Sequence, residues 1–257
     1  MFEGDKGVSG LYVMDLRRKT DVRLTFGEAL DFHPAWSPSG DRIYYESRKG
    51  GASPEILSRL ADGSGKEEII VKQAMQPHVA PDGKTLVYAT ILPQQGGELF
   101  QVPLEGDRKP AAFLQAPGNH WQPVFSPDGR YVAYESHESG RSEIFLKAFP
   151  AGEGKWQVSP NGGVTPRWDR SGTRLYYLQG DSLMEVDVST KSTVVLGTPR
   201  MLFSGAEAHL RWYFWYDVSP DGRTFVAVRE TLEDKTKLHS LRVVENWYAE
   251  FRDKQKK

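Results

Sequence analysis

Residues 122–136 read QPVFSPDGRYVAYES, and this stretch decides the fold because variants of it recur along most of the chain. The segment SPDG at 126–129 has the composition of a tight turn. Serine opens such a turn, proline fixes φ at its second position, and glycine accepts the left-handed conformation that closes it. The run that follows, at 131–134, is apolar and suited to a β-strand. Together these features predict a β-hairpin.

The same hairpin occurs five times, with closing glycines separated by 43, 46, 43 and 50 residues. One four-stranded propeller blade takes roughly 40–45 residues, so the spacing predicts one hairpin per blade. A two-sheet sandwich with accidentally similar strands is the alternative, and five copies at near-constant spacing speak against it. The other copies are HPAWSPSGDRIYYES from His33, QPHVAPDGKTLVYAT from Gln76, TPRWDRSGTRLYYLQ from Thr165 and WYDVSPDGRTFVAVR from Trp215; the glycines are Gly40, Gly83, Gly129, Gly172 and Gly222.

The apolar runs after the turns do not alternate strictly with polar residues, so we expect both faces of these strands to be buried between blades. Third strands are predicted after each hairpin, for example EILSRL from Glu55 and EIFLKAF from Glu143. An additional third-and-fourth pair stands near the N-terminus, LYVMDL from Leu11 and VRLT from Val22.

Five first-and-second pairs against six third strands leave two arrangements open. In a five-bladed ring, residues 22–25 complete the last blade. In a six-bladed ring, the missing hairpin lay upstream, and the chain is the C-terminal piece of a longer protein with an exposed strand edge. We favour six blades, one of them incomplete. We predict one all-β domain, a β-propeller of four-stranded blades over residues 1–250, with repeats near 33–75, 76–121, 122–164, 165–210 and 215–245, and a charged tail at 251–257.

Composition removes several classes of function. The formal net charge is -1, which gives no basic excess for nucleic-acid binding. No run of about eighteen apolar residues is present, so we predict no membrane span. The segment Met1–Ser9 does not have the apolar core of a secretory signal. The chain has no cysteine, which excludes disulfides, thiolate catalysis and cysteine-ligated metals.

The SPDG hairpins and the strand LYVMDL resemble the WD40-like repeats of TolB and its relatives, from Leu11 to about Val244. The tail VVENWYAEF from Val243 resembles the closing segment of propellers that follow serine/threonine kinase or regulator domains in bacterial proteins. This resemblance implies a sensory or docking module, periplasmic or otherwise extracytoplasmic, that is monomeric or tethered to an upstream domain. The kinase motifs HRD and DFG do not occur in the chain.

Similar propellers also precede prolyl-oligopeptidase-type hydrolase domains, and a catalytic serine of that kind needs a G-x-S-x-G elbow. The chain contains no such string. We therefore predict no catalytic residue, no enzyme activity and no cofactor. A substrate-gating propeller of such a peptidase is the alternative function.

His33, His78 and His120 lie at the start of three consecutive first strands, at odd offsets from the local prolines. An ideal strand points residues at odd offsets to one type of face, so we expect the three imidazoles near the mouth of the central channel. Hydrogen bonds to loop carbonyls and a metal site are both compatible with this placement. We favour the hydrogen bonds and predict no metal ligands.

Two further groups complete the predicted ligand site. Arg167 and Asp217 hold the same register position in successive units and could form a charge pair across the channel or contact a charged ligand; we favour the salt bridge. Trp121 lies in a polar-aromatic loop of the third unit, and an aromatic cluster breaks the repeat before the fifth, with Arg211, Trp212 and Trp215. Trp, Tyr and Arg dominate binding hot spots, although aromatics in propellers also serve packing. We expect a non-catalytic binding module that recognises a protein, peptide or small ligand at the channel mouth.

Overall fold

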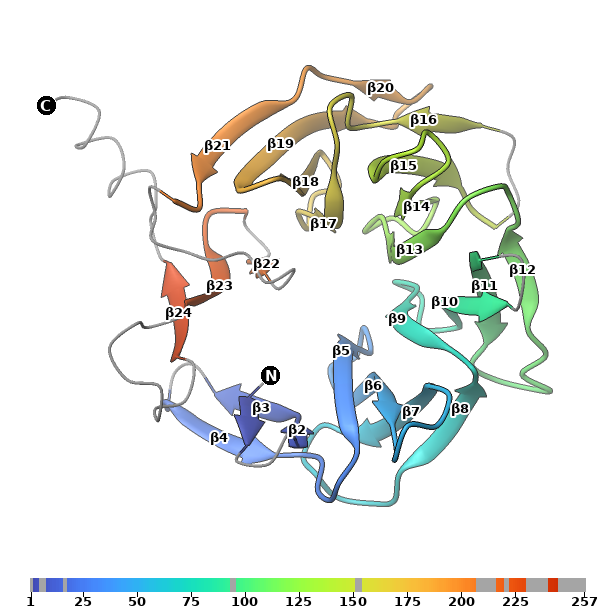
Figure 1. The fold of residues 1–257 in the computed structure, drawn as a ribbon, viewed down its shortest axis with the longest axis vertical. Helices are drawn as coiled ribbons and strands as arrows, with labels where there is room; N and C mark the ends of the chain where they lie inside the picture. The colour runs from blue at the N-terminus through green and yellow to red at the C-terminus, as the bar shows by residue number, and fades with distance from the viewer. Residues whose placement is uncertain are drawn as a thin grey trace, which may run out of the picture.

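A computed structural model of the chain describes residues 2–4, 8–15, 18–92, 96–150, 154–206, 216–219, 222–229 and 240–244. These residues form seven antiparallel sheets and no helix. The sheets are arranged around a common centre, and in the five that contain a predicted hairpin the first strand of the hairpin lies nearest that centre (Figure 1). The all-β propeller predicted from the hairpin repeat is therefore confirmed.

Four sheets are complete blades in meander order. Three of them have four strands: β5 (Leu30–Trp36), β6 (Arg42–Arg48), β7 (Glu55–Leu60) and β8 (Glu68–Lys72); β9 (Met75–Val79), β10 (Thr85–Leu92), β11 (Gly96–Pro103) and β12 (Ala111–Leu114); β13 (His120–Phe125), β14 (Tyr131–Ser136), β15 (Glu143–Ala148) and β16 (Lys155–Gln157). The fourth contains β17 (Val164–Trp168), β18 (Arg174–Gln179) and β19 (Ser182–Ser189), with β20 (Val195–Leu196) and β21 (Arg200–Ser204) both paired to β19.

The remaining sheets are smaller. One contains β22 (Tyr216–Val218), β23 (Phe225–Arg229) and β24 (Ser240–Val244); β3 (Tyr12–Asp15) pairs with β4 (Thr20–Arg23), and β1 (Phe2–Gly4) pairs with β2 (Val8–Gly10). The β3–β4 pair lies between β24 and β5 in the ring (Figure 1). In the part of the chain that the structure describes, β4 pairs only with β3. The described strands thus follow the arrangement of six blades with one incomplete. Among them, residues 22–25 do not pair with the last blade.

The five predicted turns close in one way. Each closing glycine donates its N–H to the carbonyl of the residue that opens the turn, three positions earlier, as Gly129 does to Ser126 at 2.8 Å, and each has a positive φ of 68–74°. Neighbouring turns also touch. A Cβ built on Gly129 would lie 3.5 Å from Pro81 of the preceding turn, and one on Gly172 would lie 3.4 Å from Pro127. The proline and the glycine therefore shape each turn, and they also pack neighbouring turns against each other.

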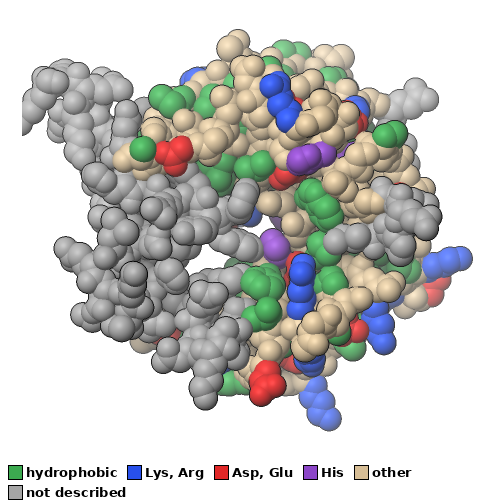
Figure 2. All heavy atoms as spheres, in the orientation of Figure 1, with side chains coloured by type: hydrophobic (Ala, Val, Ile, Leu, Met, Phe, Trp, Pro, Cys, Tyr) green, Lys and Arg blue, Asp and Glu red, His purple; other side chains and the backbone are tan. Residues whose placement is uncertain are grey.

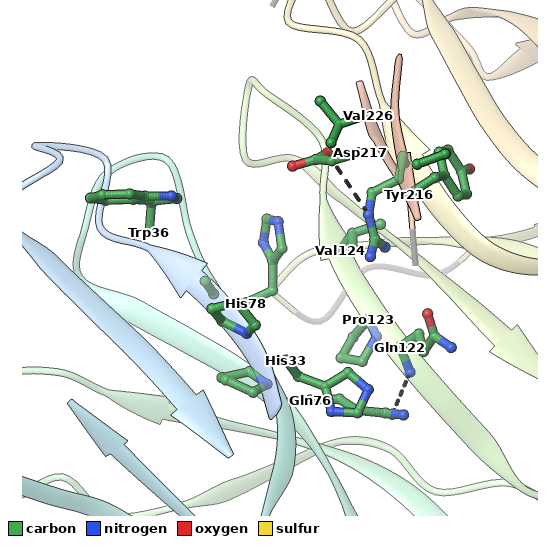
Figure 3. A pocket seen from close by; sticks show the side chains of 15 residues that line it. His33, Trp36, Gln76, His78, Gln122, Pro123, Val124, Tyr216, Asp217 and Val226 are labelled. Carbon is green, nitrogen blue, oxygen red and sulfur yellow. Dashed lines mark hydrogen bonds and ion pairs between the residues drawn. The ribbon is translucent and has the colours of Figure 1, made fainter. Parts of the chain in front are cut away.

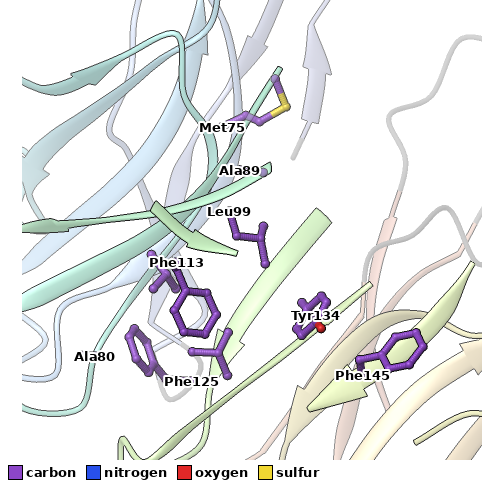
Figure 4. Packing of buried hydrophobic residues seen from close by; sticks show 10 residues of the cluster. Met75, Ala80, Ala89, Leu99, Phe113, Phe125, Tyr134 and Phe145 are labelled. Carbon is purple, nitrogen blue, oxygen red and sulfur yellow. The ribbon is translucent and has the colours of Figure 1, made fainter. Parts of the chain in front are cut away.

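The hydrophobic core is divided into clusters that lie between blades. In the cluster of Figure 4, Leu99 and Phe113 meet Phe125, Val132 and Tyr134 of the next blade. The consecutive residues Val132, Ala133 and Tyr134 of β14 are all fully buried, which confirms that both faces of a second strand are covered. Each blade thus depends on its neighbours for burial of its apolar faces.

The β3–β4 pair packs on the blade that follows it along the chain. Leu11 and Leu24 form a buried cluster with Ile43, Tyr45 and Leu57 of strands β6 and β7. Leu11 also accepts a hydrogen bond from the backbone N–H of Leu24 at 2.8 Å. The β3–β4 pair therefore packs against the second and third strands of the β5–β8 blade.

Replacing Ile144 with alanine tests the burial between blades. Ile144 is fully buried in the cluster shared by the β13–β16 and β17–β21 sheets, so we expect Ile144→Ala to lower the free energy of unfolding by about 2–5 kcal/mol. Ile69 on β8 is 49% exposed, and Ile69→Ala should change it by less than about 0.5 kcal/mol. Urea unfolding followed by circular dichroism measures both. Equal losses in the two variants would contradict packing between blades.

Candidate functional site: the mouth of the central channel

Four successive first strands carry the same irregularity, a residue in the left-handed region directly before a proline. Between two consecutive pairs of the strand ladder, both of these residues of the first strand and one residue of the second strand are left unpaired. An example is the step from the pair Trp121–Glu135 to the pair Val124–Ala133. This is a β-bulge, which redirects side chains and is frequent beside functional sites. The residues with positive φ are His33 (48°), Gln76 (54°), Gln122 (50°) and Thr165 (58°).

The residue opposite each bulge is a buried tyrosine, and this repeat explains why the bulges align. Two residues of the first strand face this single residue of the second strand at each bulge. A left-handed conformation costs an ordinary residue roughly 1–2 kcal/mol, so the surrounding packing must hold it. The tyrosines are Tyr45, Tyr88, Tyr134 and Tyr177, with relative exposures of 1%, 3%, 0% and 0%.

The bulges place side chains around a cavity of about 510 Å³ at the centre of the ring. The space-filling view is hollowed at this place, and Figure 3 shows side chains converging on it from several strands (Figure 2, Figure 3). Two positions per strand contribute: the residue before the proline and the residue after it. The first set is His33, Gln76 and Gln122, and the second is Ala35, His78, Val124 and Arg167, with Trp36, Tyr216 and Asp217 beside them.

Hydrogen bonds between blades hold the bulges in place. The backbone N–H of Gln76 donates to the Glu46 carboxylate of the preceding blade at 3.3 Å, and Thr165 donates likewise to Glu135. In the blade between them Ala89 occupies the corresponding position, and the acceptor comes instead from Gln76, whose Oε1 receives the N–H of Gln122 at 2.8 Å. The first strands β9, β13 and β17 are thus each tied to the blade before them.

Glu46 is a buried carboxylate with partners on both oxygens. His33 Nδ1 lies 2.9 Å from Oε2, and Arg48 Nε donates to Oε1 at 2.8 Å. Burial by itself favours the neutral acid, but the hydrogen bonds and charges of His33 and Arg48 hold the pKa of Glu46 below its ordinary value. Glu46 therefore stays charged and fixes the orientation of the His33 ring.

His78 follows the proline of β9, and its ring projects into the channel (Figure 3). The backbone N–H of Phe125 donates to His78 Nδ1 at 3.3 Å, which requires that this nitrogen carry no hydrogen. Burial, together with the positive charge of Arg167, lowers the pKa of His78 to about 4. The ring is therefore neutral near pH 7, and its Nε2–H is a donor.

The charge pair expected between Arg167 and Asp217 is present. Arg167 Nε lies 4.0 Å from Asp217 Oδ1, while Arg167 Nη1 donates to the carbonyl of Pro166 at 2.8 Å. The guanidinium also lies over the Tyr216 ring, 5.8 Å from its centroid, and the Tyr216 hydroxyl donates to the Thr165 carbonyl. The Asp217 side chain is 77% exposed against 25% for Arg167, so the carboxylate stands at the rim and the cation deeper in the wall.

The structure does not bring the three predicted histidines together. His33 and His78 line the cavity, but His120 is fully buried, with Nε2 3.1 Å from the Ala116 carbonyl and its ring against Tyr134. The bulge before Pro123 breaks the two-residue period, so counting offsets from the proline fails on its far side. Among the described residues, no three histidine and carboxylate side chains are grouped as metal ligands.

The predicted aromatic residues also separate. Trp121 packs into the buried cluster between two blades, with its ring so close to Gly97 that a Cβ there would lie at 2.7 Å. It does not line the cavity. Arg211, Trp212 and Trp215, and the charged tail at 251–257, lie outside the described residues.

Several residues of the cavity wall were not predicted, among them Trp36, Gln76 and Gln122. The two glutamines could have been found from the recurrence of a residue directly before proline, in HP, QP, QP and TP. Trp36 has no such signal. At its position in the next two blades Val79 and Phe125 are 5% and 3% exposed, whereas Trp36 is 52% exposed. Its exposure follows from its neighbours in the ring.

Comparisons with known proteins identify the fold. No protein-family model matches the chain. The uncharacterized protein Atu1656 of Agrobacterium fabrum is 28% identical over 142 residues, which cover 49% of this chain and 47% of that protein. The match thus spans about half the length of this curated relative.

Among solved structures, TolB from Acinetobacter baumannii matches 92% of this chain with a TM-score of 0.73 and 16% identity, and the match covers 57% of TolB. A puromycin-hydrolyzing peptidase of Mycobacterium tuberculosis matches 92% of this chain with a TM-score of 0.61 and 17% identity, over 40% of its length. At these identities the similarity shows the fold, a TolB-like β-propeller.

The low pKa of His78 predicts a specific dependence of stability on pH. An unfolded histidine titrates near 6.5 and folded His78 near 4, so the unfolded state binds more protons between these values. The contribution is complete above pH 6.5 and is lost as the pH falls toward 4. Imidazole nitrogen shifts in NMR spectra should show the Nε2–H tautomer at pH 6, and Arg167→Gln should raise the pKa of His78. A titration near 6.5 would contradict the buried geometry.

The link between blades through Gln76 predicts a cost for removing its side chain. Gln76→Ala leaves the half-buried N–H of Gln122 without its acceptor, and we expect a loss of about 1–3 kcal/mol in the free energy of unfolding. Gln73 has the same φ of 54° but an exposed side chain, so Gln73→Ala is the matched control and should change little. Thermal unfolding of both variants makes the comparison. A loss confined to Gln73→Ala would show that the link does not stabilise the ring.

Proposed function

We propose that this TolB-like β-propeller is a non-catalytic binding or sensory module whose channel mouth recognises a segment of a protein or peptide. The observation that carries the proposal is the cavity of about 510 Å³, which has the size of a ligand site and combines apolar walls with a few polar side chains. Gln76, Gln122, His78 and Arg167 supply the polar groups, and the prolines and Trp36 supply the apolar ones.

Trp36 favours a macromolecular ligand. Large exposed tryptophans are frequent hot spots of protein interfaces, and this one is 52% exposed at the edge of the cavity. The matching residues of the next two blades, Val79 and Phe125, are buried. A ligand segment that enters the channel can therefore cover an apolar surface that the propeller leaves open.

The backbone of the site supports recognition as well. Four residues with positive φ stand before the prolines, and such strain is concentrated at functional sites when the surrounding structure enforces it. The bonds between blades and the buried tyrosines hold these residues before any ligand arrives. A site ordered in advance loses little conformational entropy on binding.

The wider setting is proposed from the resemblance to TolB and to propellers of bacterial signalling proteins. We place the module outside the cytoplasmic membrane, as part of a longer signalling or envelope protein that transmits binding at the propeller. No helix long and apolar enough to span a membrane occurs in the described residues.

A substrate-gating propeller of a peptidase is the second candidate. It is favoured by the structural similarity to the puromycin-hydrolyzing peptidase, of which this chain matches 40%. Gating requires a hydrolase domain in the same protein, whereas sensing requires a signalling domain or an envelope partner. Peptide hydrolysis by the full-length protein that is lost on deletion of the propeller would favour gating.

A peptide selection tests recognition at the channel. We expect peptides enriched on the purified chain to bind Trp36→Ala at least about tenfold more weakly, because truncation of a hot spot costs 2 kcal/mol or more. Phe26 is 67% exposed and does not line the cavity, so Phe26→Ala should bind unchanged. Isothermal titration calorimetry gives the affinities. Enriched peptides that bind Trp36→Ala and the parent chain equally would place recognition elsewhere.

A further inference from the structure

We propose that the channel mouth selects a ligand that bears a carboxylate, and that Arg167 is the residue that receives it. The inference rests on the proposed function, since it names the chemistry that the same cavity recognises. The carboxylate can belong to an acidic side chain or to the C-terminus of a peptide, and both present the same two acceptor oxygens.

Arg167 is ordered before a ligand binds. Its Nη1 donates to the Pro166 carbonyl at 2.8 Å, and its guanidinium lies over Tyr216, whose hydroxyl is itself bonded to the Thr165 carbonyl. Among the described residues that line the cavity, Arg167 is the sole lysine or arginine. A guanidinium presents its donors in a planar fork that fits two carboxylate oxygens, so a fixed one is a suitable anion receptor.

The neighbouring polar groups offer hydrogens rather than lone pairs. His78 accepts the N–H of Phe125 through Nδ1, so its ring hydrogen is on Nε2, and the imidazole also has a hydrogen bond with the backbone of Val79. Gln76 accepts the N–H of Gln122 through Oε1, which leaves its amide nitrogen as a donor. Arg167 of β17 and the Gln76 amide of β9 thus offer donors from two blades to one cavity, with neutral His78 beside them, an arrangement that favours an acceptor without hydrogens of its own.

The buried carboxylate near the cavity does not oppose this choice. Glu46 is bonded to His33 and Arg48, so its charge is compensated within its own blade. Most of the first-strand positions after the prolines are neutral, with Ala35, Val124 and a His78 that is uncharged near pH 7. The charge that a ligand meets in the channel is therefore set by Arg167 and Asp217.

Asp217 is the internal competitor. Its carboxylate is 4.0 Å from Arg167 Nε, beyond hydrogen-bonding distance, and 77% exposed, so the pair is a loose contact at the rim. Exposed ion pairs contribute little to stability, and a ligand carboxylate can approach the guanidinium more closely. Asp217 thereby weakens the binding of acidic ligands, and a neutral residue at this position would remove that competition for Arg167.

Four short peptides with capped N-termini test the inference against the intact chain by saturation-transfer NMR. One pair is acetyl-Ala-Ala-Glu-Ala-Ala-amide and its Gln counterpart; the other is acetyl-Ala-Ala-Ala-Ala with a free or an amidated C-terminus. We expect the charged member of at least one pair to bind about tenfold more tightly than its neutral partner, as a charge-assisted hydrogen bond implies. The pair that shows the difference identifies the source of the carboxylate.

Variants assign the effect to Arg167. Arg167→Gln should remove the preference, Arg167→Lys should keep part of it, and Asp217→Asn should tighten binding of the charged peptide about threefold, since an exposed pair is worth up to about 1 kcal/mol. Arg170 is exposed and does not line the cavity, so Arg170→Gln is the matched control. Far-UV circular dichroism confirms that each variant is folded.

Several outcomes would overturn the inference. Equal binding within both pairs, no binding of any of the four peptides, or a preference that survives in Arg167→Gln would each exclude a carboxylate receptor at this position. If the peptides enriched in the selection still depend on Trp36, the channel mouth recognises peptides without a carboxylate receptor at Arg167, and the proposed function is retained. Enrichment of peptides that ignore both residues would remove the proposed function as well.

Discussion

Every part of this molecule depends on the burial of its second strands on both faces. Val132, Ala133 and Tyr134 follow one another along β14 and are all buried, which a single sheet with one solvent face does not allow. Only a neighbour on each side can cover them. The ring of blades follows from this need, and so does the division of the core into clusters between blades rather than one central core.

The same packing creates the channel. At each bulge two residues of the first strand lie opposite one buried tyrosine of the second strand, and residues beside the prolines line the cavity. Glu46, Gln76 and Glu135 accept hydrogen bonds from backbone N–H groups of the following blade, and these bonds fix the bulges relative to one another. Elements that stabilise the ring are therefore the ones that position the site.

The chemistry of the channel comes from variation at equivalent positions. The residue after the proline is Ala35, His78, Val124 or Arg167 in successive blades, so one scaffold position supplies apolar, neutral polar and charged groups. The cation and the carboxylate of Asp217 meet because they occupy the same position in adjacent sheets. A propeller can change its ligand by substitution at these positions without altering the blades.

The repeat SPDG and its spacing were sufficient to determine the hairpins, the blades, the closing glycines and the pairing of Arg167 with Asp217, because these follow from local turn chemistry and a constant register. The direction of the side chains near each proline was decided only by the tertiary structure. The bulge shifts the two-residue period there, so His120 is buried while Gln76 and Gln122 reach the channel. The exposure of Trp36 likewise depends on which strands lie beside it in the ring, and no local pattern of the chain encodes that.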